Sequence, residues 1–168
     1  MKGGQKGAIA LEYLILLTGV LVPATFSIIF TSELLWVWHS GIEFTRDGAR
    51  YAATHCWQGA GDNVRAYMQE HVPLTVDRQQ FQNAGSDVIV IEYFARDAET
   101  GELAEFSCDG ECSTSCVPDV VSVRIQNYEF RHAFLSYLGL PSVPMPEFRT
   151  TLPMESAGCD PEQGQCFP

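Results

Sequence analysis

The chain has 168 residues, with 10 basic and 21 acidic side chains and a formal net charge of −11 at pH 7. This balance argues against a nucleic-acid-binding protein, because phosphate recognition needs a basic face. The length allows one modest folded domain beside an apolar segment.

The first predicted element is a membrane-spanning helix. Residues 7–32 are apolar apart from Glu12, and residues 13–32 contain no charged side chain over 20 positions. At about 1.5 Å per residue, these positions form roughly 30 Å of helix, the hydrocarbon thickness of a bilayer. Trp36 and Trp38 follow, where aromatic rings suit the membrane interface.

The charges around this helix predict its orientation. Lys2 and Lys6 precede it, and all eight arginines lie beyond residue 45. The positive-inside rule therefore predicts a cytoplasmic N-terminus and an extracytoplasmic C-terminal domain. Three interpretations of residues 1–32 compete: a permanent single-pass anchor, a secretory signal peptide cut near residues 22–24, and a third that explains the acid in the apolar run.

The third interpretation depends on the spacing around Gly7. A basic leader, MKGGQKG, ends at Gly7, the following chain starts at Ala8, and Glu12 is then its fifth residue. This arrangement resembles the class III signal of type IV pilins, and the Glu12-Tyr13 pair resembles the Flp subclass of that family.

Two further stretches carry the resemblance to TadE-like pseudopilins. They are the RDGARYAA segment at 46–53 and the pair of end segments VSVRI at 121–125 and FRTTLPME at 148–155. The resemblance covers about residues 4–155. It leaves out the cysteine-rich insert at 108–116 and the tail after Ser156.

The resemblance implies a minor pseudopilin of a tight-adherence (Flp-type) pilus system, a structural or assembly protein rather than an enzyme, with no cofactor. It divides the chain into a leader (1–7), a transmembrane and assembly helix (8–38) and an extracytoplasmic domain (39–168). The implied partners are a prepilin peptidase, other pilins and pseudopilins, the pilus assembly platform and the bacterial inner membrane. A membrane-anchored envelope domain with a ligand-binding or redox role is the alternative.

Glu12 and Tyr13 then belong to the assembly stretch. Cleavage between Gly7 and Ala8 creates an α-amine on Ala8. An unpaired carboxylate and an unpaired ammonium are both costly in lipid, so we expect Glu12 to pair with this amine, within one chain or between subunits. Glu12 snorkelling toward the headgroups is the simpler alternative.

The helix is expected to loosen near Pro23 and Gly19 and to continue past Trp38. Small or apolar residues then recur with helical spacing, which predicts either an intramolecular core or a subunit contact, with the core favoured: Ile42, Thr45, Ala49, Ala52 and Ala53. Glycines at 59 and 61 end this helix, and Asp62 is expected to cap a second one at 63–71.

The remainder predicts an antiparallel sheet, and the fold class is therefore α+β: a long helix laid on three or four strands. Strands are expected at 87–96, 102–108 and 120–130, the last with a bulge near 126–127. A long connection at 131–147 leads to an edge strand at 148–154, because Pro153 cannot donate a ladder hydrogen bond.

Six cysteines follow the apolar helix, and in an exported domain they predict disulfides: Cys56, Cys108, Cys112, Cys116, Cys159 and Cys166. The Pro- and Gly-containing segment between Cys159 and Cys166 predicts a closed C-terminal loop. One of the three insert cysteines is expected to bond Cys56.

A metal site and a catalytic site are not predicted. The C-x3-C-x3-C spacing of the insert lacks the tight pairs and fourth ligand of zinc and iron–sulfur sites. The four histidines show no ligand spacing, and nucleophile, zinc-protease and phosphate-loop motifs are absent from the sequence.

Overall fold

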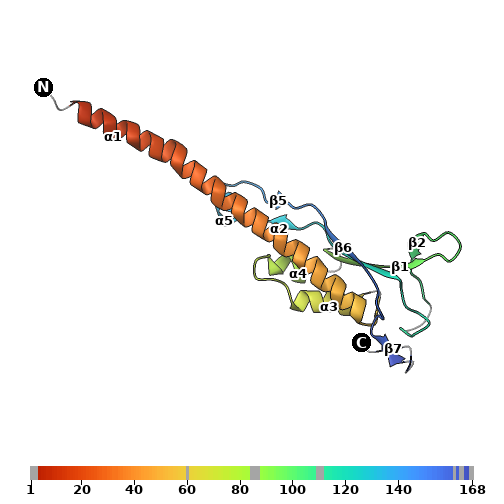
Figure 1. Ribbon diagram of the computed structural model, residues 1–168. Coiled ribbons are helices and arrows are strands. Elements are labelled where there is room, and N and C mark those ends of the chain that lie inside the picture. Colours follow the sequence, from red (N-terminus) through yellow and green to blue (C-terminus); the bar gives the residue numbers. More distant parts are fainter. Residues whose placement is uncertain are drawn as a thin grey trace. The chain divides into compact units, whose positions relative to one another are not determined.

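The computed structural model describes residues 4–59, 61–83, 88–108, 112–160, 162 and 165–166. The chain forms two compact units, Met1–Trp36 and Val37–Pro168, which we call the anchor unit and the sheet unit. The unit boundary falls inside a helix, two residues before the boundary at 38/39 expected from the sequence. Figure 1 labels the elements of both units.

The described residues of the anchor unit, 4–36, are all helical. It contains α1 (Gly4–Leu16), the π-helical segment η1 (Leu17–Leu21) and the start of α2 (Val22–Thr54). Residues 9–29 are all exposed. Among the described residues, one helical run, Ile9–Thr54, is long and apolar enough to cross a membrane, and its most apolar stretch is not buried against any other part of the chain.

The segment η1 is the local loosening expected from the sequence. The backbone N–H of Val22 donates to the carbonyl of Leu17, five residues back, as in a π turn. Pro23 has no N–H and its ring crowds the preceding turn, so the regular α-helical pattern is interrupted just before it. Gly19 lies in the middle of the segment and adds to its pliability.

Serine and threonine side chains of the anchor unit bond within the helix. Five hydroxyl groups donate to backbone carbonyls three or four residues earlier, at 2.7–2.9 Å: those of Thr18, Thr25, Ser27, Thr31 and Ser32. Such back-bonding satisfies the donors of these five hydroxyls, which suits a helix in a medium without hydrogen-bonding partners.

The sheet unit contains a four-stranded antiparallel sheet with the order β2-β1-β3-β6. Its strands are β1 (Ile89–Arg96), β2 (Leu103–Glu105), β3 (Val120–Ile125) and β6 (Phe148–Pro153). The α+β class, the inner position of β1 and the edge position of β6 are confirmed. The β2 strand is shorter than expected and its three side chains are exposed.

The second part of α2, from Val37, packs on this sheet. Thr45 and Thr150 share a hydrogen bond of 2.9 Å, and the Trp38 and Phe148 rings meet edge to face at 5.4 Å. Three residues of the predicted stripe, Ala49, Ala52 and Thr45, are fully buried. The intramolecular core is therefore confirmed for the stripe, although Ile42 at its start is only half-buried.

Two short helices, α3 (Asp62–Glu70) and α4 (Arg78–Asn83), lie against the same part of α2 (Figure 1). Val64 and Met68 of α3 are fully buried, and Phe81 of α4 meets Phe44 of α2 ring to ring at 5.5 Å. Glycine permits this close packing, because a Cβ added at Gly48 would lie 2.5 Å from Sδ of Met68.

The predicted cap of α3 is wrong. Gly61 occupies the N-cap position in a left-handed conformation (φ 99°), and no side chain caps this end. Asp62 is already inside the helix, where its carboxylate bonds the guanidinium of Arg65. Gly61 takes the position because an L residue would be strained at this φ and its Cβ would lie 2.9 Å from Ile91.

The predicted bulge near residues 126–127 is also wrong. The β3 strand ends at Ile125, Asn127 adopts φ 57°, and the chain enters a separate two-stranded sheet of β4 (Glu129–Phe130) and β5 (Val143–Pro144). The shift in the apolar pattern therefore marks a change of sheet. The connection between β4 and β5 contains α5 (Ala133–Tyr137).

Candidate functional site

Two regions carry the residues singled out from the sequence, one in each unit. In the anchor unit, Gly7, Ala8, Glu12 and Tyr13 all lie in α1. Glu12 and Tyr13 are exposed, Tyr13 by 68%. The backbone between Gly7 and Ala8 is helical, so a peptidase that cuts there must first open the helix.

Apolar side chains flank Glu12 along the described part of the helix. Leu11, Leu14 and Ile15 are each at least 59% exposed. A carboxylate among such side chains is costly in a lipid or protein interior unless a cation pairs with it. The cleavage role of Gly7 and Ala8 and the assembly role of Glu12 and Tyr13 stay predictions.

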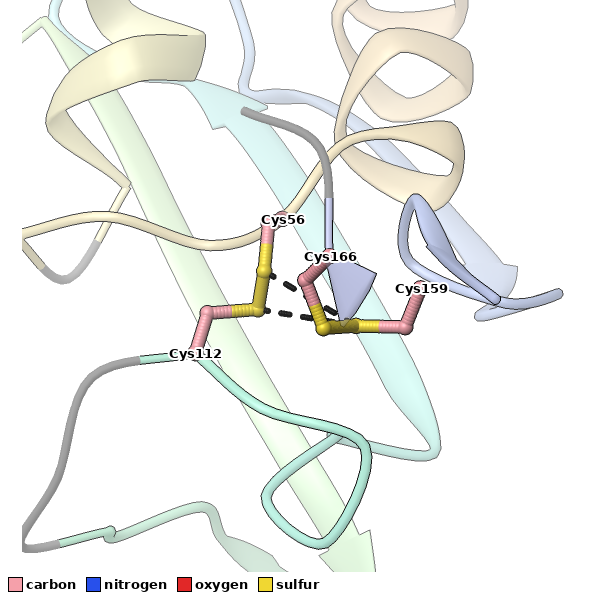
Figure 2. Close-up of side chains that lie close together, drawn as sticks. All are labelled: Cys56, Cys112, Cys159 and Cys166. Atoms are coloured by element: carbon pink, nitrogen blue, oxygen red, sulfur yellow. Dashed lines mark hydrogen bonds between the residues drawn. A yellow bond between two sulfur atoms is a disulfide. The ribbon is translucent and has the colours of Figure 1, made fainter. Parts of the chain in front are cut away.

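In the sheet unit, cysteines from three distant segments meet. Cys56 follows the end of α2, Cys112 belongs to the insert, and Cys159 and Cys166 lie on the paired strands β7 (Cys159–Asp160) and β8 (Gln165–Cys166). Disulfides join Cys56 to Cys112 and Cys159 to Cys166. Figure 2 shows these two bonds lying against each other.

The closed C-terminal loop expected between Cys159 and Cys166 is therefore present. The expected cross-link from Cys56 to the insert is also present, and it closes a sequence separation of 56 residues. The choice among the insert cysteines, which the sequence left open, falls on Cys112. The third disulfide joins Cys108 to Cys116 within the insert.

The four sulfurs of Figure 2 form one cluster, which we call the sulfur cluster. All four lie within 4.8 Å of one another. Sγ of Cys159 is 3.9 Å from Sγ of Cys56 and 3.9 Å from Sγ of Cys112. Bonded sulfurs carry no proton, so these are van der Waals contacts between two disulfides.

In each disulfide of the sulfur cluster, one cysteine is more deeply buried than the other. Cys56 and Cys159 are buried, with 3% and 6% exposed, whereas Cys112 and Cys166 are half-buried. Each bond therefore has one residue turned toward the protein interior and one nearer solvent. No local sequence pattern signals this contact, because the three segments are brought together only by the tertiary fold.

Local hydrogen bonds hold the three segments in place. The side-chain amide of Asn63 donates to the carbonyl of Cys56 at 2.8 Å, and the indole N–H of Trp57 donates to the carbonyl of Cys116 at 2.9 Å. In the tail, the N–H of Cys159 donates to the carbonyl of Ser156, and Ala157 is fully buried. Packing therefore holds residues 156–159 in place in addition to the disulfide.

The sulfur cluster is also the one group of described residues whose composition suits a metal ion. Four thiolates at this spacing are a donor set for tetrahedral zinc. As disulfides the sulfurs are not available, because metals bind the thiolate form. The absence of a metal and of a cofactor stays a prediction.

A groove of about 260 Å³ lies beside β1 and β2. Its lining is aromatic and acidic: Trp57, Tyr93, Phe106, Glu92 and Glu105, with Ile91, Ser107 and Cys108. The buried Tyr93 hydroxyl has no hydrogen-bond partner in the described part of the chain, and burial raises the pKa of Tyr93 well above its usual range. Tyr93 is thus neutral at physiological pH.

In comparisons with known proteins, no protein-family model, curated protein or solved structure matches this chain.

Proposed function

We propose that this chain is a minor, TadE-like pseudopilin of a tight-adherence (Flp-type) pilus system. In this proposal a prepilin peptidase cuts between Gly7 and Ala8, and the apolar helix then enters a filament or priming complex or remains in the inner membrane. The sheet unit lies outside the cytoplasm. The observation that carries the proposal is the single acid, Glu12, at position five after Gly7 in the otherwise uncharged residues 7–32.

The exposed surface of the anchor unit supports this role. Large apolar side chains cover it all round, among them Ile9, Leu14, Ile28 and Ile29, each at least 53% exposed. Five serine and threonine hydroxyls of this unit bond to the helix backbone. A surface of this kind is stable in lipid or in a helix-packed filament core, where no water is available.

Glu12 distinguishes an assembly helix from a simple anchor. A permanent anchor gains nothing from a carboxylate there, since its presence costs free energy on insertion. A subunit that carries a new α-amine on Ala8 gains a partner for that carboxylate. The amine of one subunit and Glu12 of its neighbour neutralise each other when the helices pack in register.

The sheet unit supports a structural rather than a catalytic role. The small-residue face of α2 is used internally, against Thr150, Phe148 and Met68, and is not left open as a subunit contact. Salt bridges of the unit pair neighbouring surface charges, such as Arg124 with Glu92 at 2.6 Å. These contacts stabilise the folded sheet unit, which in this proposal is attached to the membrane helix.

The test is the variant Glu12→Ala, expressed in a pilus-forming strain whose own copy is deleted. We expect normal cleavage and membrane insertion but a large loss of incorporation into pili, because the amine of Ala8 loses its carboxylate partner. The measurement is the fraction of the chain recovered with sheared pili.

The matched control is Glu33→Ala, which removes the first acid after the uncharged run of residues 13–32. Under the proposal, this variant incorporates at wild-type levels. Normal incorporation of Glu12→Ala would contradict the assembly role. Equal losses in both variants would assign the effect to helix charge in general.

A further inference from the structure

The sulfur cluster has an arrangement that a purely structural pair of cross-links does not need. Two separate disulfides touch through sulfur, and the point of contact is the buried Cys159, which is 3.9 Å from both Cys56 and Cys112. Cys108 and Cys116, the third pair, are outside the group of four sulfurs that lie within 4.8 Å.

We propose that Cys56, Cys112, Cys159 and Cys166 form a thiol–disulfide exchange site that reacts with an external dithiol. The half-buried Cys166 is the point of attack, and the buried Cys159 passes the exchange to the cross-link between Cys56 and Cys112. The proposal follows from the geometry of the sheet unit and does not depend on a role in pili.

The first step opens the C-terminal loop. A thiolate of the external dithiol attacks Sγ of Cys166, a mixed disulfide forms with Cys166, and the bond between Cys159 and Cys166 breaks. Cys159 leaves with the electron pair as a thiolate. Attack by a thiolate on the more accessible sulfur is the ordinary course of such exchange.

The second step takes place inside the protein. The Cys159 thiolate, already in contact with the second disulfide, attacks Sγ of Cys112. A bond between Cys112 and Cys159 forms, the bond between Cys56 and Cys112 breaks, and Cys56 becomes the thiolate. Attack on Cys56 instead forms a bond between Cys56 and Cys159 and releases Cys112; both sulfurs are equally distant.

The external dithiol completes the balance. Its second thiolate attacks the mixed disulfide, releases Cys166 as a thiolate and leaves the reagent as a cyclic disulfide. Two electrons have passed from the dithiol to the protein, which retains one disulfide of the cluster and gains two thiols. When the new bond joins Cys112 to Cys159, the end of α2 is no longer cross-linked to the insert.

The experiment uses the full chain in detergent with the variant Cys166→Ser, which leaves Cys159 without its partner. At mildly alkaline pH, where thiolate forms, we expect Cys159 to exchange with the cross-link. Alkylation of free thiols followed by non-reducing peptide mapping should then find the label divided between Cys159 and the pair Cys56 and Cys112.

The matched control is Cys116→Ser, which frees Cys108 in the same insert but outside the sulfur cluster. We expect its label to remain on Cys108. Label confined to Cys159 in the Cys166→Ser chain would overturn the proposal. Equal disulfide scrambling in the Cys116→Ser control would also overturn it, because exchange would then not require the sulfur cluster.

A second measurement covers the case in which Cys166→Ser does not fold. The wild-type chain is treated with a limiting amount of dithiothreitol, quenched with acid and mapped. A bond from Cys159 to Cys112 or Cys56, found together with a free Cys166, supports the exchange site. Stepwise loss of the native bonds with no new pairing contradicts it.

Discussion

The two parts of α2 have the same backbone conformation but differ in which side chains they expose and which they bury. From Val22 to Trp36 the helix exposes large apolar residues, such as Phe26 at 45% and Trp36 at 66%. From Val37 to Thr54 it buries a face of glycine, alanine and threonine, in which Ala49 and Ala52 are fully buried. One continuous helix therefore changes its environment without a break in the chain.

Side-chain size accounts for the difference. Small residues let helix and sheet backbones approach closely, so the second part has its packing partner in the same chain. Large exposed aliphatic residues have no such partner and need an apolar medium from outside. The comparison predicts that the first part tolerates changes of shape but not charge, and that the second part tolerates surface charge but not added volume.

The largest expected effect concerns the cross-link at the end of the buried part. Removal of the bond with Cys56→Ala and Cys112→Ala should lower the free energy of unfolding by about 4 kcal/mol, because it releases a closed loop with a 56-residue separation. The paired variant Cys159→Ala and Cys166→Ala should cost about 2.5 kcal/mol, because its loop has a separation of 7 residues. Urea unfolding in detergent measures both, and a larger loss from the tail pair would contradict the assignment of the main cross-link.

The second prediction tests the exposed part with a charge. Ile28 is 67% exposed in the middle of the apolar run, and Ile28→Lys should cost about 3 kcal/mol on membrane insertion. The chain should then be depleted from carbonate-washed membranes. Thr54→Lys, at an exposed position of the buried part, should leave the membrane fraction unchanged. Equal membrane fractions for the two variants would mean that the exposed part does not lie in lipid.

The smallest effect comes from added volume. Gly48→Leu places atoms against the fully buried Met68, and overpacking of this kind should lower the free energy of unfolding by about 1–3 kcal/mol. A Cβ at Gly19 meets no atom within 4 Å, so Gly19→Leu is the matched control and should not change the stability of the sheet unit. The readout is the urea midpoint of each variant, and matching midpoints would remove the distinction between the two parts.

The sequence was sufficient for features that depend on local pattern. The apolar run predicted the helix, and the β-branched and aromatic residues of 87–96 predicted the central strand. The proline at position 153 predicted the edge position of β6. The sequence was not sufficient at Asn127. There the alternation of apolar residues shifts by one position, and this shift is the same whether the strand contains a bulge or leaves its sheet. The sequence also misled at the start of α3. Asp62 suggested a side-chain cap, whereas the N-cap position is held by Gly61 in a left-handed backbone conformation.

The sulfur cluster shows why the site was harder to predict than the fold. Short spacing between Cys159 and Cys166 indicated their bond, since little chain entropy opposes so small a loop. Nothing local indicated that this bond would touch the one between Cys56 and Cys112. That contact depends on the tail packing near the end of α2, a tertiary arrangement in which residues 56, 112 and 159 meet.

The mature N-terminus of the chain, determined by intact mass and N-terminal sequencing of protein extracted from membranes, tests the central claim most directly. The proposed pseudopilin begins at Ala8, because only cleavage after Gly7 places Glu12 at position five. A chain that begins at Thr25 would contradict the claim, since the apolar helix would then be a secretory signal, and a chain that keeps Met1 would leave only a permanent anchor.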